Sequence, residues 1–373
     1  MTEKQDIKLI EEGETEVLVF KQKSSKKGPG SKHKEPFYNP AMELNRDLSV
    51  LINQWFVKSC KKHVHLLDGL AASGIRGVRW ACEIQGDFEV TINDWNEQAF
   101  SLIKKNISHK ELKNVTATNM NLNALLSENC YHYIDIDPFG SPVYFVDSAM
   151  RSIYNNGIIA CTATDTATLC GVYPKVCLRR YSAKPYHSFM MHETGLRILL
   201  GVLCRMTARY DKGIEPIVSY SDDHYFRVYA KVRKGKSYAN NSIKNLCHIN
   251  SNKLTVSSDG RITDVGSLWM GKLHNKNIVR ELRTILFEKH LNTKHTLWKL
   301  LDLFEEEADA PAFFYTTDDL ASFLHMSPPK IENIFDRIKK KGYDIVRTHF
   351  NPTGFKTNAP LAKIKEVFKE DKT

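Results

Sequence analysis

Short apolar segments that alternate with helical segments are the feature of this sequence that most limits its fold. The first, residues 64–67, ends in Asp68 and Gly69, and a glycine-bearing loop then leads into a helix that ends near Ile84. Further segments expected to be strands follow at 88–92, 115–118, 131–137 and 157–163, with a late pair at 216–220 and 225–232. Strands that alternate with helices build a doubly wound, mostly parallel sheet, so we predict an α/β fold.

Polar residues follow several of these strands, and an open α/β sheet binds its ligands at the carboxyl ends of its strands. Asp68 follows the first strand, and Asp94 follows the second, 25 residues after Gly69. An acid in the position of Asp94 commonly binds ribose hydroxyls. It also suits the start of the helix expected at 96–106, and the two roles are compatible. Asn121 and Leu122 follow the third strand, where residues typically contact the base of a nucleotide cofactor.

The fourth strand runs into the most informative segment, Asp135-Ile136-Asp137-Pro138-Phe139 followed by Gly140. Asp137 and a neighbouring backbone carbonyl are acceptors for the N–H groups of an exocyclic amine, and the ring of Phe139 can stack on the base. Two acceptors that hold the amine hydrogens aim its lone pair, as methyl transfer requires. A strand that ends in an ordinary Asp-Pro turn is the alternative.

Composition supports two domains and a polyanionic partner. The chain has 373 residues, 42% of them hydrophobic, and a net charge of +10. We expect a domain at 1–275 and a second at 276–373. Residues 21–34 include six Lys and one His and read as a basic surface loop. The excess of basic residues favours a nucleic acid, although a solvated surface gives the same composition.

The eight cysteines show no Cys-x-x-Cys spacing, so we expect no structural zinc and no metal. We find neither a signal peptide nor an apolar run long enough for a membrane, and we therefore expect a cytoplasmic protein. No apolar seam stands out, which favours a monomer.

The C-terminal part has a different pattern. Residues 277–307 read as helical and charged, and two short capped helices and a strand at 343–350 follow. This order is typical of a winged helix-turn-helix, whose second helix often binds nucleic acid. Its basic end, Arg337 and residues 339–341, fits that role, and a winged helix that binds protein is the alternative.

A helix is also expected at 41–58, where leucines, Ile52 and Trp55 form an apolar stripe. Arg46 lies off that stripe, free to face a pocket or solvent. The aromatic turn Phe37-Tyr38-Asn39-Pro40 leads into this helix.

These segments, taken in order, resemble the archaeal type of the tRNA (guanine-26-N2)-dimethyltransferase family over nearly the whole chain. The resemblance rests on Phe37-Tyr38-Asn39-Pro40, Asn45-Arg46-Asp47, Gly74-Ile75-Arg76-Gly77, residues 135–142, Thr162-Ala163-Thr164-Asp165, Cys170-Gly171, His192-Glu193, Gly195, Arg197-Ile198-Leu199, residues 223–227 and 347–350, Gly354, Lys356-Thr357 and Ala359-Pro360.

The resemblance implies a class I S-adenosylmethionine-dependent methyltransferase with a Rossmann-like, seven-stranded sheet. It implies methylation of the N2 amine of guanine 26 in tRNA, first to N2-methylguanosine and then to N2,N2-dimethylguanosine. The second domain would bind tRNA, and no DNA or membrane is expected as a partner.

The family's roles carry over to individual residues. Arg46, Asp68, Arg76 and Asp94 correspond to S-adenosylmethionine-binding positions. Asp137, Pro138 and Phe139 correspond to the catalytic turn, and Phe37 to a second aromatic ring against the target guanine. Asn121 and Leu122 stand where the family usually has Asp-Ala, beside the adenine of the cofactor, so this chain lacks a charge there. The role of residues 162–180 is not readable, although Arg179, Arg180 and Lys184 suggest phosphate contacts.

Other functions stay open on the residues alone. An adenine amine in DNA or RNA would suit the Asp137 turn equally well. A methyltransferase acting on a ring carbon usually needs a cysteine nucleophile, which the turn lacks. A non-catalytic RNA-binding protein on the same fold is a further class, and a nicotinamide dehydrogenase would need the absent Gly-x-Gly-x-x-Gly sequence.

Overall fold

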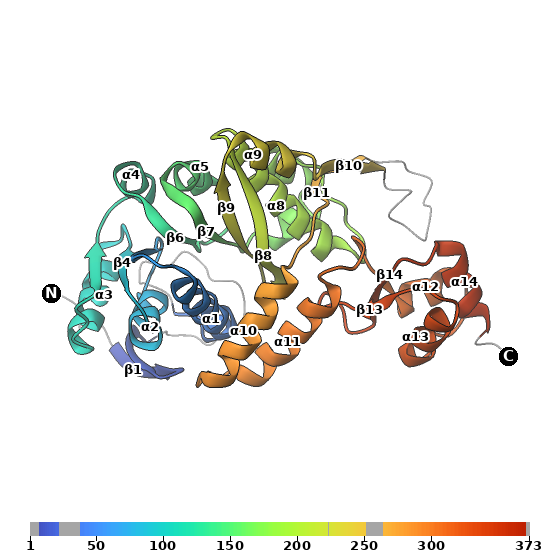
Figure 1. Ribbon diagram of the computed structural model, residues 1–373, viewed down its shortest axis with the longest axis horizontal. Coiled ribbons are helices and arrows are strands. Elements are labelled where there is room, and N and C mark those ends of the chain that lie inside the picture. The colour runs from blue at the N-terminus through green and yellow to red at the C-terminus, as the bar shows by residue number, and fades with distance from the viewer. Residues whose placement is uncertain (1–6, 22–37, 223, 251–263, 371–373) are drawn as a thin grey trace.

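The structure is a computed structural model, and it describes residues 7–21, 38–222, 224–250 and 264–370. A seven-stranded sheet forms its centre, with the strand order β5-β4-β3-β6-β7-β9-β8 (Figure 1). Neighbouring strands are parallel from β5 to β7, and β9 is antiparallel to both β7 and β8. The strands are β3 Val64–Asp68, β4 Phe88–Asn93, β5 Val115–Thr118, β6 Tyr131–Ile136, β7 Ile153–Ala163, β8 Lys212–Asp222 and β9 Tyr225–Lys234. The predicted α/β fold is confirmed.

Helices cover both faces of this sheet. They are α1 Glu43–Ser59, α2 Ile75–Glu83, α3 Glu97–His109, α4 Leu122–Glu128, α5 Val143–Ser152, α6 Thr166–Leu169, α7 Pro174–Tyr181, α8 Met191–Ala208 and α9 Lys236–Ile243, and the 3-10 helix Pro40–Met42 precedes α1. Successive strand residues therefore enter different cores: Leu66 packs with α1, and Leu67 packs with α4 and α5. Burial on both faces explains why the strands read as continuous apolar runs.

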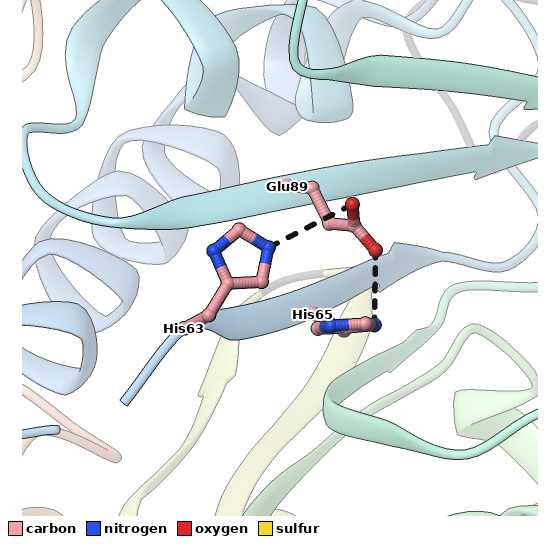
Figure 2. A group of neighbouring side chains, drawn as sticks. All are labelled: His63, His65 and Glu89. Atoms are coloured by element: carbon pink, nitrogen blue, oxygen red, sulfur yellow. Dashed lines mark ion pairs between the residues drawn. The ribbon is translucent and has the colours of Figure 1, made fainter. Parts of the chain in front are cut away.

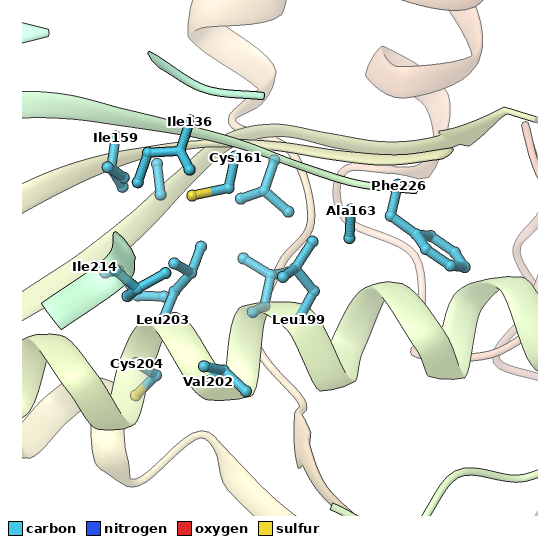
Figure 3. Packing of buried hydrophobic residues seen from close by; sticks show 14 of the residues in the cluster. Ile136, Ile159, Cys161, Ala163, Leu199, Val202, Leu203, Cys204, Ile214 and Phe226 are labelled. Carbon is cyan, nitrogen blue, oxygen red and sulfur yellow. The ribbon is translucent and has the colours of Figure 1, made fainter. Parts of the chain in front are cut away.

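The long helix α8 packs lengthwise against one face of the sheet. Figure 3 shows Leu199 and Leu203 of α8 beneath Ile136, Ile159 and Cys161 of the strands. These side chains are fully buried. This layer therefore supports β6 and β7 from below, at the point where the segment of Asp137 leaves the sheet.

Two helices, α10 Lys276–Glu288 and α11 Lys294–Glu307, form a hairpin where the sequence suggested one helical stretch. Their buried side chains, Leu282 and Leu301 among them, belong to the same core as α1 and the sheet. The division at 275/276 remains a prediction, but the apolar side of this hairpin is part of the core around the sheet.

A smaller core follows, with helices α12 Thr317–Phe323, α13 Ile331–Lys340 and α14 Leu361–Lys369. Its antiparallel sheet has the order β12-β14-β13, with β12 Tyr315–Thr316, β13 Ile345–Arg347 and β14 Gly354–Thr357. The predicted strand at 343–350 is thus shorter, because only Ile345–Arg347 pairs with β14 and a turn follows at 349–350. This unit lies at one end of the molecule (Figure 1). Its assignment as a winged helix remains a prediction.

Two hairpin-like pairs lie outside these sheets. β1 Ile7–Glu12 pairs with β2 Thr15–Phe20, and β10 Leu246–Asn250 pairs with β11 Asp264–Trp269, both antiparallel. Among the described residues, no helix combines the length and apolarity needed to cross a membrane.

Candidate active site

Three aspartates lie together at the carboxyl edge of the central strands. Asp68 ends β3, Asp94 follows β4 and Asp137 follows β6. Because β4, β3 and β6 are neighbours and parallel, their carboxyl ends meet at one edge of the sheet. This is the position at which open α/β sheets bind ligands. The structure thus brings together the acids that the sequence placed on three separate strands.

The turn after β6 is fixed from the neighbouring strand. The Gly140 N–H donates to Thr164 Oγ1 at 2.6 Å, and the Thr164 N–H donates to the Gly140 carbonyl at 2.9 Å. Gly140 has φ +94°, which a residue with a side chain rarely adopts. The turn holds Phe139 with 48% of its surface exposed and leaves the Asp137 side chain 20% exposed. An aromatic face and a carboxylate are therefore both accessible at this edge.

Arg76, a predicted cofactor-binding residue at the start of α2, contacts Asp137. Its Nη2 donates to Asp137 Oδ2, and its Nη1 donates to Asn45 Oδ1 at 2.8 Å. Arg76 is buried, and Asp135 Oδ2 lies 3.8 Å from its Nη1. The guanidinium therefore orients the carboxylate of the turn. Sequence reasoning missed this contact, because nothing in the spacing pairs residues 76 and 137.

Asp135, two residues before Asp137, is fully buried. Arg227 of β9 donates to its two oxygens at 2.9 and 2.6 Å and to Thr162 Oγ1 at 2.8 Å. The Tyr133 hydroxyl donates to Asp135 Oδ2 at 2.9 Å. Burial alone would raise the pKa of Asp135, but the guanidiniums of Arg227 and Arg76 outweigh it and hold that pKa below its usual value. A buried ionic network thus underlies the turn.

Asp94 organises the loop after β3. Its Oδ2 accepts from the Ala72 N–H at 2.8 Å, and its Oδ1 accepts from the Asn96 N–H at 2.9 Å. Burial raises the pKa of Asp94, and these two N–H donors oppose the shift. The side chain that caps α3 belongs to Asn96 rather than to Asp94. Asp94 therefore lies between the two loops, in the position expected of a ribose-binding acid.

Asp68 is buried below this loop. Its Oδ2 accepts from the Gly77 N–H at 3.0 Å, in the first turn of α2. Burial raises the pKa of Asp68 to about 7, although Arg76 opposes the shift. Asp68 thus ties β3 to α2 and shapes the loop between them.

Arg46 was expected to face a pocket or solvent, and that orientation is wrong. Its side chain is buried and bonded to Glu12 of β1, with Nε at 2.7 Å from Oε2 and Nη2 at 2.5 Å from Oε1. Tyr38 donates to the same carboxylate at 2.7 Å. The cause is the hairpin of β1 and β2, which supplies an acid to the side of α1 opposite its apolar stripe.

Asn121 and Leu122 begin α4. The Asn121 side chain is the N-cap, because its oxygen accepts from the Asn123 N–H at 3.0 Å. Leu122 is buried and lies against Gly69, where a Cβ would come within 2.9 Å of its methyl group. Both residues lie near the loop after β3. Phe37 and, apart from Lys21, the basic loop at 21–34 lie outside the described residues.

The segment at 162–180, whose role the sequence did not indicate, packs beside the turn, and Tyr181 follows it. Asp165 accepts from the Tyr181 hydroxyl at 2.5 Å, and Arg180 Nη1 lies 3.2 Å from its Oδ2. Arg180, expected to contact phosphate, therefore pairs with an acid of its own segment. Thr164 of the same segment holds Gly140. This segment forms the wall of the site next to Phe139.

A cavity of about 620 Å³ lies elsewhere, between β8, α9 and residues 269–277. Its charged side chains already have partners: Arg233 lies 3.1 Å from Glu215, and Lys272 lies 2.5 Å from Asp309. The acids at the strand ends therefore make the carboxyl edge of the sheet, rather than this cavity, the candidate active site.

Comparison with known proteins identifies the family of this chain. Residues 13–369 match the family model described as N2,N2-dimethylguanosine tRNA methyltransferase. The chain is 38% identical to a tRNA (guanine(26)-N(2))-dimethyltransferase of Methanobrevibacter smithii, over 97% of each chain. It is 39% identical to the protein of that name from Thermococcus kodakarensis, over 96% of this chain and 98% of the relative.

A solved structure also matches. Trm1 from Pyrococcus horikoshii, determined in complex with S-adenosyl-L-methionine, superimposes with a TM-score of 0.84 at 34% identity, over 96% of this chain and 99% of that one. A class I methyltransferase fold, with its seven-stranded sheet and helices on both faces, is therefore established. The chain belongs to the family of N2,N2-dimethylguanosine tRNA methyltransferases.

Proposed function

We propose that this chain transfers methyl groups from S-adenosylmethionine to the N2 amine of guanine 26 in tRNA, giving N2-methylguanosine and then N2,N2-dimethylguanosine. The family and the names of its relatives support this function. The observation that carries it is the turn of Asp137, Pro138 and Phe139, which offers a carboxylate beside an accessible aromatic ring at the carboxyl edge of the sheet.

Asp137 is the residue that acts on the amine. The nitrogen lone pair of guanine N2 is delocalised into the ring, so the amine is a poor nucleophile. Hydrogen bonds from its N–H groups to the Asp137 carboxylate and to a carbonyl of the turn localise that lone pair and aim it. The nitrogen loses a proton once it carries the new methyl group, and Asp137 is the base within reach. Arg76 keeps the carboxylate in place for both steps.

The base has to leave its stack before N2 can reach Asp137. We assign Phe139 as one stacking face for the turned-out guanine and Phe37 as the other. Unstacking a base costs a few kcal/mol, and stacking on an aromatic side chain returns about 1–3 kcal/mol. The accessible ring of Phe139 suits this use.

S-adenosylmethionine supplies an electrophilic methyl group, and the residues present fit it. Each carboxylate oxygen of Asp94 accepts one hydrogen bond from a backbone N–H. Each oxygen can accept another, so both ribose hydroxyls could be bound. Asn121 and Leu122 lie beside the position of the adenine. Asp68 and Arg76 shape the loop that would cover the methionine part.

Arg46 belongs to the residues that surround the cofactor-binding residues. Its guanidinium is bonded to Glu12, so we assign it to the support of the site rather than to direct contact.

The outer face of α7 is a suitable surface for the tRNA backbone. Tyr173 and Leu178 are more than half exposed, and Lys175 and Arg179 are exposed beside them. Exposed aromatic and basic side chains next to a base pocket are typical of RNA-binding surfaces. With the net charge of +10, we expect tRNA affinity to fall steeply with salt. We further infer a cytoplasmic protein that acts on tRNA and not on DNA, and a monomer, since no apolar seam stands out in the sequence.

The direct test is methylation of unmodified tRNA transcripts with labelled S-adenosylmethionine, followed by mapping of the modified nucleoside. We expect N2-methylguanosine and N2,N2-dimethylguanosine at position 26. Label in a methylated adenosine would refute the assigned acceptor, and cofactor binding without methyl transfer would point to a non-catalytic RNA-binding protein.

Variants separate the roles of the turn. Asp137→Ala should cut turnover severely with nearly unchanged tRNA affinity, and Phe139→Ala should reduce turnover by the loss of a stacking face. Asp302→Ala, on the partly exposed surface of α11, is the control. Turnover and affinity falling together in Asp137→Ala would give Asp137 a structural role. Turnover near the wild-type value in Phe139→Ala would remove that ring from the mechanism.

A further inference from the structure

Four titratable side chains gather on one face of the sheet, at the edge opposite the candidate active site. His63 and His65 lie two residues apart at the amino end of β3, and Asp87 and Glu89 lie two residues apart at the amino end of β4. The two strands are parallel, with His65 directly opposite Glu89. Residues two apart on a strand point to the same side, so both imidazoles and both carboxylates share one face.

The Glu89 carboxylate reaches across to both imidazole rings (Figure 2). Its Oε2 lies 3.7 Å from His63 Nε2, and its Oε1 lies 3.0 Å from His65 Nδ1. The three potential ligand atoms all lie within 4.8 Å of one another. In a tetrahedral site with bonds of about 2.0–2.1 Å, ligand atoms are separated by about 3.3 Å. The two measured separations lie on either side of that value, so side-chain rotations alone would close the site around an ion.

Asp87 orients the His63 ring for metal binding. Its Oδ1 lies 2.6 Å from His63 Nδ1, on the side of the ring that faces away from Glu89. A carboxylate in that position holds the proton on Nδ1 and directs the lone pair of Nε2 toward the site. Most metal-binding histidines have such a partner on their second nitrogen. The nearby His132 is not a ligand through Nδ1, because that nitrogen accepts from the His65 backbone N–H at 3.1 Å.

A second group with ligand spacing is buried at the end of α11. It consists of His274, Glu307 and His349. Its carboxylate already faces a cation, because Lys356 Nζ lies 3.3 Å from Glu307 Oε2. Thr348 donates to the same oxygen at 2.9 Å. An added metal ion would therefore be repelled by the lysine, and this group is a structural ion pair. The group of His63, His65 and Glu89 has no such cation among the contacts that the structure describes.

We propose that His63, His65 and Glu89 bind one divalent transition-metal ion, with Zn²⁺ as the model ion and water in the remaining position. Two imidazoles and one carboxylate suit Zn²⁺, Co²⁺ or Ni²⁺ and not Mg²⁺, which prefers oxygen ligands. The ion would cross-link β3 to β4 on the side of the sheet away from Asp137. The spacing of cysteines cannot reveal this site, because its ligands are imidazoles and a carboxylate on two strands.

The test is titration of the untagged full chain, stripped of metal with a chelator, by calorimetry with Zn²⁺ and by absorption with Co²⁺. We expect one ion per chain, a visible Co²⁺ spectrum without a thiolate charge-transfer band, and no heat with Mg²⁺. His65→Ala should abolish binding. Asp87→Asn should weaken it by about 10–100-fold, as loss of such a partner does elsewhere. His290→Ala removes an exposed histidine outside the group and should leave the affinity unchanged.

Methyl transfer should be the same in His65→Ala as in the wild type, so this test does not depend on the proposed function. Absence of saturable Zn²⁺ binding to the wild-type chain would overturn the proposal. Unchanged affinity in His65→Ala, or a thiolate band with Co²⁺, would overturn it equally, because the ion would then be bound elsewhere. Circular dichroism of each variant distinguishes lost ligands from lost folding.

Discussion

Removing the buried ion pair between Arg227 and Asp135 tests how the carboxyl edge of the sheet is stabilised. Both side chains are fully buried, and the guanidinium donates to both carboxylate oxygens at 2.9 and 2.6 Å. Arg227→Met removes the guanidinium and leaves the buried Asp135 carboxyl without its bonded partner. Removing one partner of a buried pair destabilises a protein by about 3–5 kcal/mol.

The structure gives this loss a pH dependence. In the wild type the lowered pKa of Asp135 contributes stability above its ordinary value of 3.8, and that stability is lost as the pH falls. Without Arg227 the nearest described cation is Arg76, which lies 3.8 Å from Asp135 and is already paired with Asp137. We therefore expect burial to outweigh Arg76, so that the carboxyl is protonated in the folded state and ionises only on unfolding. At 1.36 kcal/mol per pH unit above 3.8, keeping that proton costs about 4.4 kcal/mol at pH 7 and about 1.6 kcal/mol at pH 5.

The assay is urea unfolding at pH 5 and pH 7, followed by far-ultraviolet circular dichroism. Arg227→Met should lower the free energy of unfolding by about 2.7 kcal/mol more at pH 7 than at pH 5. Thr162→Val is the control, because it removes only the 2.8 Å bond from Arg227 to a neutral oxygen. That control should lose about 2 kcal/mol at both pH values. An equal loss for Arg227→Met at the two pH values would refute an Asp135 held ionised by Arg227.

Two further predictions concern other buried acids. Asp68→Asn should raise the melting temperature more at pH 8 than at pH 5. Burial raises the pKa of Asp68 to about 7, so its contribution to stability falls as the pH rises from 3.8 through 7; equal shifts at both pH values would contradict this. Lys356→Met should destabilise the chain by about 3–5 kcal/mol in thermal or urea unfolding, because Lys356 lies 3.1 Å from Glu193 and 3.3 Å from Glu307, all buried. Lys363→Met, on the surface, should leave the midpoint almost unchanged, and an equal effect of both would argue against the buried triad.

The amino-acid sequence was sufficient to predict the strands of the sheet and the acids that follow them. Strands buried on both faces are apolar throughout, so their ends are visible as the first polar residues. The positions of Asp94 and Asp137 at strand ends therefore follow from the pattern of apolar and polar residues alone. The parallel sheet followed from the alternation of strands with helices, and its antiparallel edge followed from the close spacing of the last pair.

The partners of the site residues could not be predicted in this way. Arg76 and Asp137 are 61 positions apart, and Arg227 and Asp135 are 92 positions apart. Local periodicity carries no information about such pairs. Arg46 shows the same limit: its place off the apolar stripe of α1 indicated solvent, but the hairpin of β1 and β2 and the helices α10 and α11 bury that side as well.

The hairpin of α10 and α11 also governs when the chain can fold during synthesis. The core beneath α1 draws residues from Val17 to Phe304, and Asp47 of α1 accepts from the Thr293 N–H at 3.1 Å and from its hydroxyl at 2.6 Å. The strands of the sheet and the turn of Asp137 leave the ribosome long before that hairpin does. Until it arrives, the part of this core that α10 and α11 cover is exposed, and nascent chains with exposed apolar surface are prone to aggregate. The enzyme is therefore vulnerable while it is being made, because helices made late close a core whose first residues are made early.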